Sequence, residues 1–159
     1  MGLFVKKKKE TLIYSPIKGK VMEIAKTPDP VFAEKMMGDG VVIFPNDTSL
    51  YAPVDGKIKV LFPTKHAIGI ETNGGIEVLI HIGIDSVKLN GKGFYPLVKE
   101  GDWVSKGDKL MDFDLEMLEK EAVSSAIPVL ITNQGKHSLH VYIEKAFVDI
   151  EDCILKITE

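Results

Sequence analysis

Two histidines, His66 and His81, stand on either side of an Asn73-Gly74 pair that is flanked by alternating apolar residues. Asn-Gly between such runs is a strong signal for a two-residue β-hairpin turn, because both turn residues must adopt positive φ. With Asn73-Gly74 as the loop, Thr72 pairs with Gly75 and the numbers of paired residues sum to 147. His66 and His81 then lie directly opposite each other. This pairing predicts Cβ atoms about 4.5–5.5 Å apart on one face of the hairpin.

The same register places further side chains on the histidine face. The expected pairs are Phe62 with Asp85, Thr64 with Gly83, Ile68 with Leu79, and Ile70 with Glu77. The histidines are thus expected beside a hydroxyl, a carboxylate and an apolar rim, and Gly83, without a side chain, is expected to leave open space beside His81. The opposite face is the predicted core side and carries Val78, Ile80, Ile82 and Ile84. A shift of one residue would send one histidine to the other face.

Two facing imidazoles suit phosphoryl transfer. An imidazole with a pKa of about 6.5 is mostly neutral at pH 7, so one ring nitrogen keeps a lone pair that can attack phosphorus. The second imidazole and the Thr64 hydroxyl can donate hydrogen bonds to phosphoryl oxygens. Two histidines and a carboxylate can also hold Zn²⁺ with one position open. A zinc-binding or zinc-hydrolase domain that uses His66 and His81 is therefore the alternative, and a pair of ordinary strand histidines is a third interpretation.

The composition fits one compact domain. The chain has 159 residues, of which 45% are hydrophobic, and we expect a flexible tail over residues 1–10 and a single domain over 11–159. A net charge of −3 gives no reason to expect a nucleic-acid partner. The single cysteine, Cys153, cannot form an internal disulfide, and no apolar run reaches the roughly 18 residues that span a bilayer. We therefore expect a cytoplasmic protein, in which the lysine run 6–9 allows weak contact with a membrane surface.

Turn signals recur every 8 to 15 residues between short runs of Val, Ile, Leu and Phe, which is typical of an all-β sandwich or barrel. Two short helices are expected, one over 31–37 and one over 115–122 with Asp114 as its N-cap. The segment 15–21, SPIKGKV, is repeated 37 residues later as 52–58, APVDGKI. We interpret this repeat as a duplicated β motif.

The histidine segments resemble those of the glucose-family enzyme IIA of the bacterial phosphoenolpyruvate:sugar phosphotransferase system. The segments that carry the resemblance are 63–68, PTKHAI, and 79–85, LIHIGID. Further similar segments follow the family's order, at 30–35, 38–40, 52–56, 101–108 and 113–115, and residues 1–4 are similar to the start of some members. The resemblance thus covers nearly the whole chain.

The resemblance implies a fold and a set of roles. The fold is an antiparallel β-sandwich, a barrel-sandwich hybrid with a duplicated hybrid motif. His81 carries the phosphate on Nε2, and His66 and Thr64 support it. The phosphate comes from the carrier HPr and leaves to a cysteine of an enzyme IIB domain of a sugar permease. No cofactor is implied and no metal is required, although His66 and His81 allow adventitious or regulatory zinc.

The resemblance also implies a partner-binding surface around the histidines. Its apolar part consists of Val31, Phe32, Met36, Met37, Phe62 and Leu79, and its acidic rim consists of Asp29 and Asp85. We expect Phe32, Met36, Met37, Phe62 and Leu79 to form an exposed apolar patch around the histidines. Met36, Met37 and Leu79 are often other apolar residues in the family, but polarizable methionine adapts to partners of different shape, so we expect the docking role to be kept.

Overall fold

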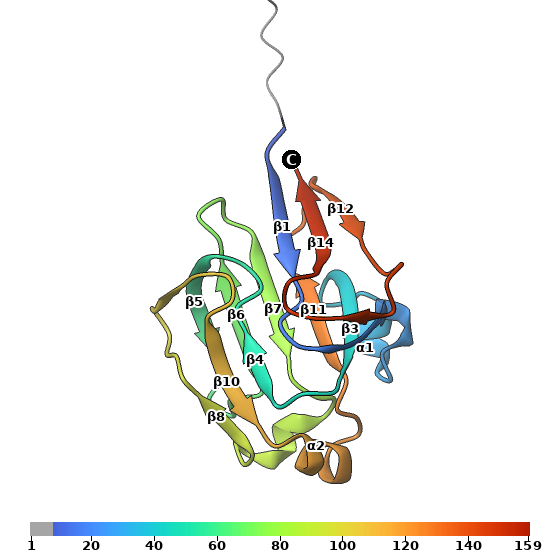
Figure 1. Cartoon of the computed structure of the whole chain (residues 1–159), viewed down its shortest axis with the longest axis vertical. Coiled ribbons are helices and arrows are strands. Elements are labelled where there is room, and N and C mark those ends of the chain that lie inside the picture. The colour runs from blue at the N-terminus through green and yellow to red at the C-terminus, as the bar shows by residue number, and fades with distance from the viewer. Residues whose placement is uncertain (1–7) are drawn as a thin grey trace, which may run out of the picture.

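Residues 8–159, which the computed structural model describes, form three antiparallel sheets (Figure 1). The strands are β1 Glu10–Tyr14, β2 Gly19–Glu23, β3 Asp39–Pro45, β4 Ser49–Tyr51, β5 Gly56–Leu61, β6 Ala67–Glu71, β7 Glu77–His81, β8 Phe94–Pro96, β9 Trp103–Val104, β10 Lys109–Phe113, β11 Ile127–Ile131, β12 Ser138–Val141, β13 Phe147–Val148 and β14 Cys153–Thr158. The helices are η1 Ile24–Lys26, α1 Pro30–Ala33, η2 Ser86–Leu89 and α2 Leu115–Glu121. The all-β prediction with short helices is confirmed.

The largest sheet has eight strands in the order β13-β2-β3-β11-β7-β6-β5-β9. The two smaller sheets have the orders β1-β14-β12 and β4-β10-β8. Figure 1 shows β1, β14 and β12 together at one end, next to the C-terminus. Of the predicted tail, only residues 8–10 are described, and Glu10 already belongs to β1. The lysine run 6–9 lies partly outside the described residues.

The main core lies between one face of the large sheet and the two small sheets. The large sheet contributes alternate residues, such as Ile43, Ile80 and Val129, and the small sheets contribute residues such as Leu155 and Leu110. All of these side chains are fully buried. Because burial of a large apolar side chain is worth about 1.5–3 kcal/mol, this cluster is the main source of stability.

A second apolar cluster covers the other face of the large sheet. Val42, Leu79 and Leu130, each next in sequence to a main-core residue, pack there with Phe32 of α1 and Ile24 of η1. The strands β3, β7 and β11 are therefore buried on both faces, which explains why their sequences are nearly continuous runs of apolar residues. The sequence pattern predicted a core on only one side of β7.

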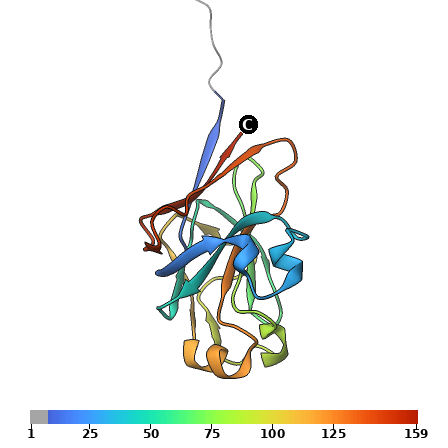
Figure 2. The ribbon, with the colours of Figure 1, turned by 90° about the vertical axis from the view of Figure 1, so that its right-hand side faces the viewer.

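Both predicted helices are present and shorter than expected. The first spans Pro30–Ala33, and its N-cap Asp29 accepts a hydrogen bond from Val31 N at 2.8 Å. The second begins at Leu115 after Asp114, which accepts from Met117 N at 3.0 Å. Figures 1 and 2 both place α2 at the end of the molecule away from the C-terminus, where it contacts η2.

The sequence repeat is also a repeat of structure. Tyr14 N donates to Pro53 O at 2.9 Å, and Tyr51 N, 37 residues after Tyr14, donates to Pro16 O at 2.8 Å. The two copies thus exchange equivalent hydrogen bonds.

The repeat extends to the strands at both edges of the large sheet. In β2, Gly19 pairs with Val148 of β13, and in β5, Gly56 pairs with Val104 of β9. An added Cβ would lie 2.4 Å from a backbone oxygen at Gly19 and 2.5 Å from one at Gly56. Glycine is required at both sites, so the duplicated β motif is confirmed down to the shared glycine.

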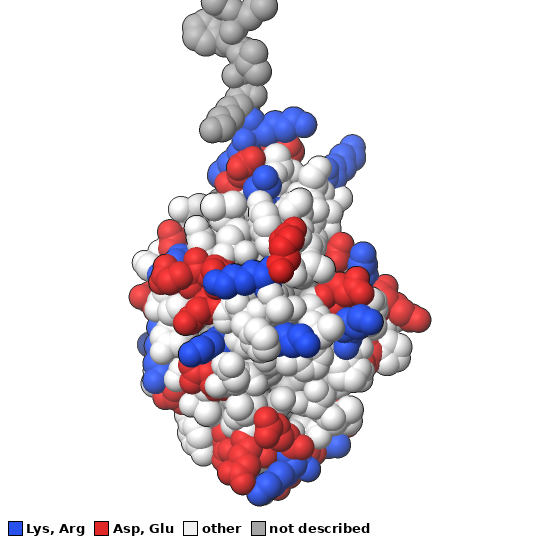
Figure 3. All heavy atoms as spheres, turned by 45° about the vertical axis from the view of Figure 1, so that its right-hand side comes forward, with Lys and Arg blue, Asp and Glu red and all other residues white. Residues whose placement is uncertain are grey.

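Lysine and acidic side chains are interspersed over the face shown in Figure 3, with uncharged areas between them. No helix within residues 8–159 has the length and apolar character needed to cross a bilayer.

Candidate functional site

The hairpin that carries the histidines has a three-residue turn. Thr72 N donates to Ile76 O at 2.9 Å and Gly75 N donates to Thr72 O at 3.0 Å, so residues 73–75 form the loop. Gly75 adopts φ 88°, as expected for the last residue of a three-residue hairpin loop. The Asn133 side chain holds this loop by donating to Gly75 O at 2.7 Å. The predicted two-residue turn is wrong, because the second glycine of Asn-Gly-Gly takes the left-handed position.

The predicted register is therefore wrong by one residue. Ala67, rather than His66, is opposite His81, and Gly69 is opposite Leu79. Ile68 consequently belongs to the main core, while Leu79 stays on the histidine side in the second cluster. Ile70 likewise lies in the main core rather than beside the histidines.

The two imidazoles nevertheless meet. Their ring centroids are 4.9 Å apart and the rings are nearly perpendicular, at 79°. His66 precedes β6, and its carbonyl accepts a hydrogen bond from Ile82 N at 2.7 Å. Lys65 has left-handed backbone, with φ 61°, so the regular alternation of side chains is interrupted just before His66. The prediction that the rings face each other is confirmed, although the pairing that led to it is not.

His81 is held in one tautomer by a backbone carbonyl. Its Nδ1 lies 2.7 Å from Gly83 O. A carbonyl oxygen only accepts, so Nδ1 carries the proton and Nε2 of the neutral ring keeps its lone pair. Gly83 has φ 82°, and this left-handed conformation turns the chain directly after His81.

Gly83 does not provide the space that the sequence analysis assigned to it. A Cβ at this position would lie 3.0 Å from Leu118 Cδ2 and 3.2 Å from Ser124 O. The glycine therefore faces α2 and residue 124, and its contribution to the site is its backbone. Its conformation and its carbonyl hydrogen bond to His81 both depend on the absence of a side chain.

His66 is oriented by Thr64. Thr64 Oγ1 lies 2.7 Å from His66 Nδ1, and His66 is buried. When the hydroxyl donates to Nδ1, the imidazole proton resides on Nε2, which can then donate to a bound anion. The predicted association of Thr64 with the histidine pair is thus present, and it acts through His66.

Two phenylalanines enclose the imidazole pair. The Phe32 ring lies 4.9 Å from the His81 ring at 56°, and the Phe62 ring lies 5.4 Å from the His66 ring at 78°. The resemblance placed Phe32 around the histidines, but its ring contact with His81 was not predicted. The Asp29-Pro30 pair signals a helix start, but not the face that the helix presents to the sheet.

The expected apolar patch is only partly exposed. Met36 and Val31 are exposed, at 70% and 39%, as is Met37, and Phe62 is half-buried. Phe32 and Leu79 are buried, at 5% and 8%, because they pack in the second cluster. The expectation that these two side chains are exposed is wrong.

Burial sets the protonation of the site. It lowers the pKa of His81 from its ordinary value of 6.5 to about 4, although the hydrogen bond with Gly83 and the negative charge of Asp29 oppose this. Burial also lowers the pKa of His66, although a hydrogen bond with the backbone of Thr64 opposes this. Asp85 lies in the turn before η2 and pairs with Lys88 at 3.1 Å. Both rings are therefore neutral at pH 7, and Asp29 is the carboxylate that acts on His81.

The site lacks a complete set of metal ligands. Within residues 8–159, no three His, Cys, Asp or Glu side chains come together in a way that could hold a metal ion. A pair of imidazoles without a third ligand does not match the three protein ligands of catalytic zinc sites.

The depressed pKa of His81 predicts a pH-dependent stability. Between about pH 4 and pH 6.5 the unfolded chain binds a proton at His81 that the folded chain does not, so stability falls as the pH falls. From pH 7 to pH 5 this effect is worth about 2 kcal/mol. Urea unfolding at pH 7 and pH 5 should show that the free energy of unfolding falls by about 2 kcal/mol more in the native protein than in His81→Gln. Equal losses in the two proteins would contradict the lowered pKa.

Known proteins resemble this chain over most of its length. The profile of the family described as phosphoenolpyruvate-dependent sugar phosphotransferase system, EIIA 1, matches residues 11–137. The PTS system glucose-specific EIIA component of Halalkalibacterium halodurans is 54% identical over 124 residues, which cover 78% of this chain and 72% of that protein. The glucose-specific EIICBA component of Staphylococcus carnosus is 49% identical over 130 residues, 82% of this chain but only 19% of that longer protein.

A solved structure shows the same fold. The glucose permease IIA from Mycoplasma capricolum superimposes with a TM-score of 0.88 at 37% sequence identity. The match covers 97% of this chain and 99% of that one.

Proposed function

Because the chain belongs to the EIIA 1 family of the phosphoenolpyruvate-dependent sugar phosphotransferase system, we propose that it is a glucose-type phosphocarrier whose phosphate is carried by His81. The observation that carries this proposal is the tautomer of His81. Its Nδ1 proton is held by Gly83 O at 2.7 Å, so Nε2 presents a lone pair beside a second imidazole.

The proposed uptake step is a direct transfer between two imidazoles. His81 Nε2 attacks the phosphorus of a phosphohistidine on HPr, and the P–N bond on the HPr side breaks as the new P–N bond forms. The proton stays on Nδ1, where Gly83 O stabilises the positive charge that develops on the ring. His66 Nε2–H donates to a phosphoryl oxygen, and Thr64 keeps the proton on that nitrogen.

The proposed release step passes the phosphoryl group to a cysteine thiolate of an enzyme IIB domain. The S–P bond forms as the P–N bond to His81 breaks, which restores the neutral imidazole. The fused EIICBA relatives are consistent with such an acceptor. The proposal includes a cytoplasmic location, in which Cys153 remains a reduced thiol.

The partner surface in this proposal is the exposed apolar group Val31, Met36 and Met37, together with the partly exposed Phe62 and the acidic Asp29 and Asp85. Phe32 and Leu79 support this surface from below. The zinc alternative is less well supported, because the pair lacks a third ligand within the described residues.

The proposal is tested by incubating the protein with phosphorylated HPr. We expect a gain of one phosphoryl group per chain, acid-labile and alkali-stable as a phosphoramidate is, followed by its loss on addition of an enzyme IIB domain. A chain that gains no phosphate under these conditions would refute the phosphocarrier role.

Phe62→Lys tests the partner surface. The substitution places a positive charge among exposed apolar side chains, so we expect phosphate uptake from HPr to slow at least tenfold. A tenfold change corresponds to about 1.4 kcal/mol, which is a usual cost for the loss of an important interface contact. The melting temperature should stay within a few degrees, because Phe62 is only half-buried. The matched control is Tyr95→Lys, since Tyr95 is 61% exposed on β8 and should tolerate the change. Equal uptake rates in both variants would place the docking surface elsewhere.

A further inference from the structure

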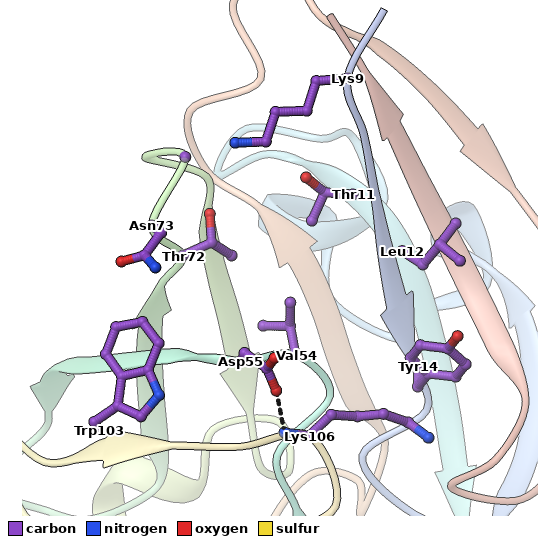
Figure 4. Close-up of a pocket in the computed structure, with 11 residues that line it drawn as sticks. Lys9, Thr11, Leu12, Tyr14, Val54, Asp55, Thr72, Asn73, Trp103 and Lys106 are labelled. Atoms are coloured by element: carbon purple, nitrogen blue, oxygen red, sulfur yellow. Dashed lines mark hydrogen bonds between the residues drawn. The ribbon is translucent and has the colours of Figure 1, made fainter.

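A hollow lies at the tip of the β6–β7 hairpin, roughly 20 Å along the strand from the histidines at its base. It has a volume of about 360 Å³ and lies between β1, the hairpin tip, the turn after β4 and the β9 segment (Figure 4). This volume is within the range of about 300–1,000 Å³ that is usual for small-ligand pockets. Its lining residues are Lys9, Thr11, Leu12, Tyr14, Val54, Asp55, Thr72, Asn73, Gly74, Trp103 and Lys106. None of them belongs to the histidine site.

Three apolar side chains, a tryptophan and two aliphatic residues, line the pocket on different sides (Figure 4). Trp103, the only tryptophan of the chain, is 54% exposed on the short edge strand β9. Leu12 is 41% exposed on β1, across the pocket from Trp103, and the buried Val54 lies between them (Figure 4). A flat, accessible indole can stack on the C–H face of a ring-shaped ligand, because its negative π face attracts polarised C–H groups.

Hydrogen-bonding groups lie among these apolar side chains (Figure 4). Asp55 Oδ1 accepts from Lys106 N at 2.7 Å, which leaves Oδ2 available as an acceptor (Figure 4). The Thr72 hydroxyl accepts from Ile76 N at 3.1 Å and retains its own proton to donate. The Asn73 amide has no hydrogen-bond partner within residues 8–159 and supplies both a donor and an acceptor.

The charges of the pocket nearly balance. Lys106 Nζ lies 4.0 Å from the Tyr14 ring centroid and pairs with Glu151 at 3.2 Å, so its charge is directed away from the pocket. This leaves the Lys9 ammonium and the Asp55 carboxylate on different walls, as Figure 4 shows. A ligand that both donates and accepts hydrogen bonds without a net charge suits this set better than an anion.

The shape favours a small molecule over an added peptide strand. The free edge of β1 faces the pocket, but Tyr14 N already donates to Pro53 O at 2.9 Å and closes one end. At the other end, Lys9 Nζ lies 3.1 Å from the position of a Cβ on Gly74. The open length of edge is therefore too short for strand pairing.

We propose that this pocket binds a neutral monosaccharide, whose ring stacks on Trp103 and whose hydroxyls bond to Asp55 and Asn73. This site is separate from the histidine pair and its occupancy does not require phosphate transfer.

The single tryptophan provides the measurement. Titration of the full chain with D-glucose should change the Trp103 fluorescence along a saturable curve. Asp55→Asn keeps an oxygen for Lys106 N but replaces the free acceptor with a donor, so its dissociation constant should rise at least tenfold. Asn73→Ala should weaken binding several-fold. The matched control is Asp47→Asn, because Asp47 also accepts a neighbouring backbone N–H, from Thr48 at 2.7 Å, outside the pocket.

Three results would overturn the inference: a fluorescence change that is linear in D-glucose, an unchanged dissociation constant in Asp55→Asn, or tighter binding of glucose 6-phosphate than of glucose. The last would mean that the lysines recognise an anion. Phosphate uptake from HPr should be unaltered in Asp55→Asn, so failure of this inference and failure of the phosphocarrier role are distinguishable.

Discussion

His81→Ala should take up no phosphate from phosphorylated HPr. The substitution removes Nε2 and its lone pair. That lone pair is free in the native protein because Gly83 O holds the ring proton on Nδ1. His66 should not replace it as the phosphate carrier, because a Thr64 hydroxyl that donates to His66 Nδ1 leaves the ring proton on Nε2. We expect uptake below detection, measured as phosphoryl groups per chain by intact-protein mass spectrometry.

Two further variants make this result interpretable. His81→Gln fills more of the space beside Phe32, so it separates loss of the nucleophile from a packing defect. His140→Ala removes an exposed histidine on β12 and should be phosphorylated normally. Phosphate on His81→Ala would show that the carrier residue has been wrongly assigned.

His66→Gln should separate uptake from release. The glutamine amide still donates a hydrogen bond to the phosphoryl group, so we expect near-normal uptake from HPr. It cannot take up or give a proton as imidazole does, so transfer to an enzyme IIB domain should slow by about 100-fold or more. Single-turnover assays of the two half-reactions would measure these rates independently.

Release at the native rate from His66→Gln would mean that hydrogen bonding alone accounts for the role of His66. Thr64→Val is the informative companion, because it removes the hydroxyl that orients His66 and preserves the side-chain shape. We expect it to slow release less than His66→Gln does.

The sequence was sufficient to predict elements whose signals are local. Asp114 before an apolar run predicted a capped helix, and the structure has α2 beginning at Leu115. The repeated Gly19 and Gly56 predicted a duplicated motif, because the same backbone crowding requires glycine at both positions.

Features that depend on packing could not be predicted in the same way. Asn73-Gly74-Gly75 is compatible with either a two-residue or a three-residue turn. The three-residue turn is stabilised by Asn133, a residue far along the chain that donates a hydrogen bond to Gly75 O. Phe32 and Leu79 are buried because α1 folds onto the second face of the large sheet, which no local pattern indicated. The rings of the histidine pair meet because of a left-handed Lys65, so the correct geometry was reached through an incorrect register.

The duplicated motif also explains why there is a single histidine site. An approximate dyad passes through the Val129–Ile80 pair at the centre of the large sheet. The dyad exchanges β11 with β7. Leu130, which pairs with Gly40, is therefore the counterpart of His81, which pairs with Ala67. Leu130 is fully buried and apolar. The histidine pair thus has no counterpart in the other half of the internally symmetric scaffold, so the proposed mechanism predicts one phosphoryl group per chain.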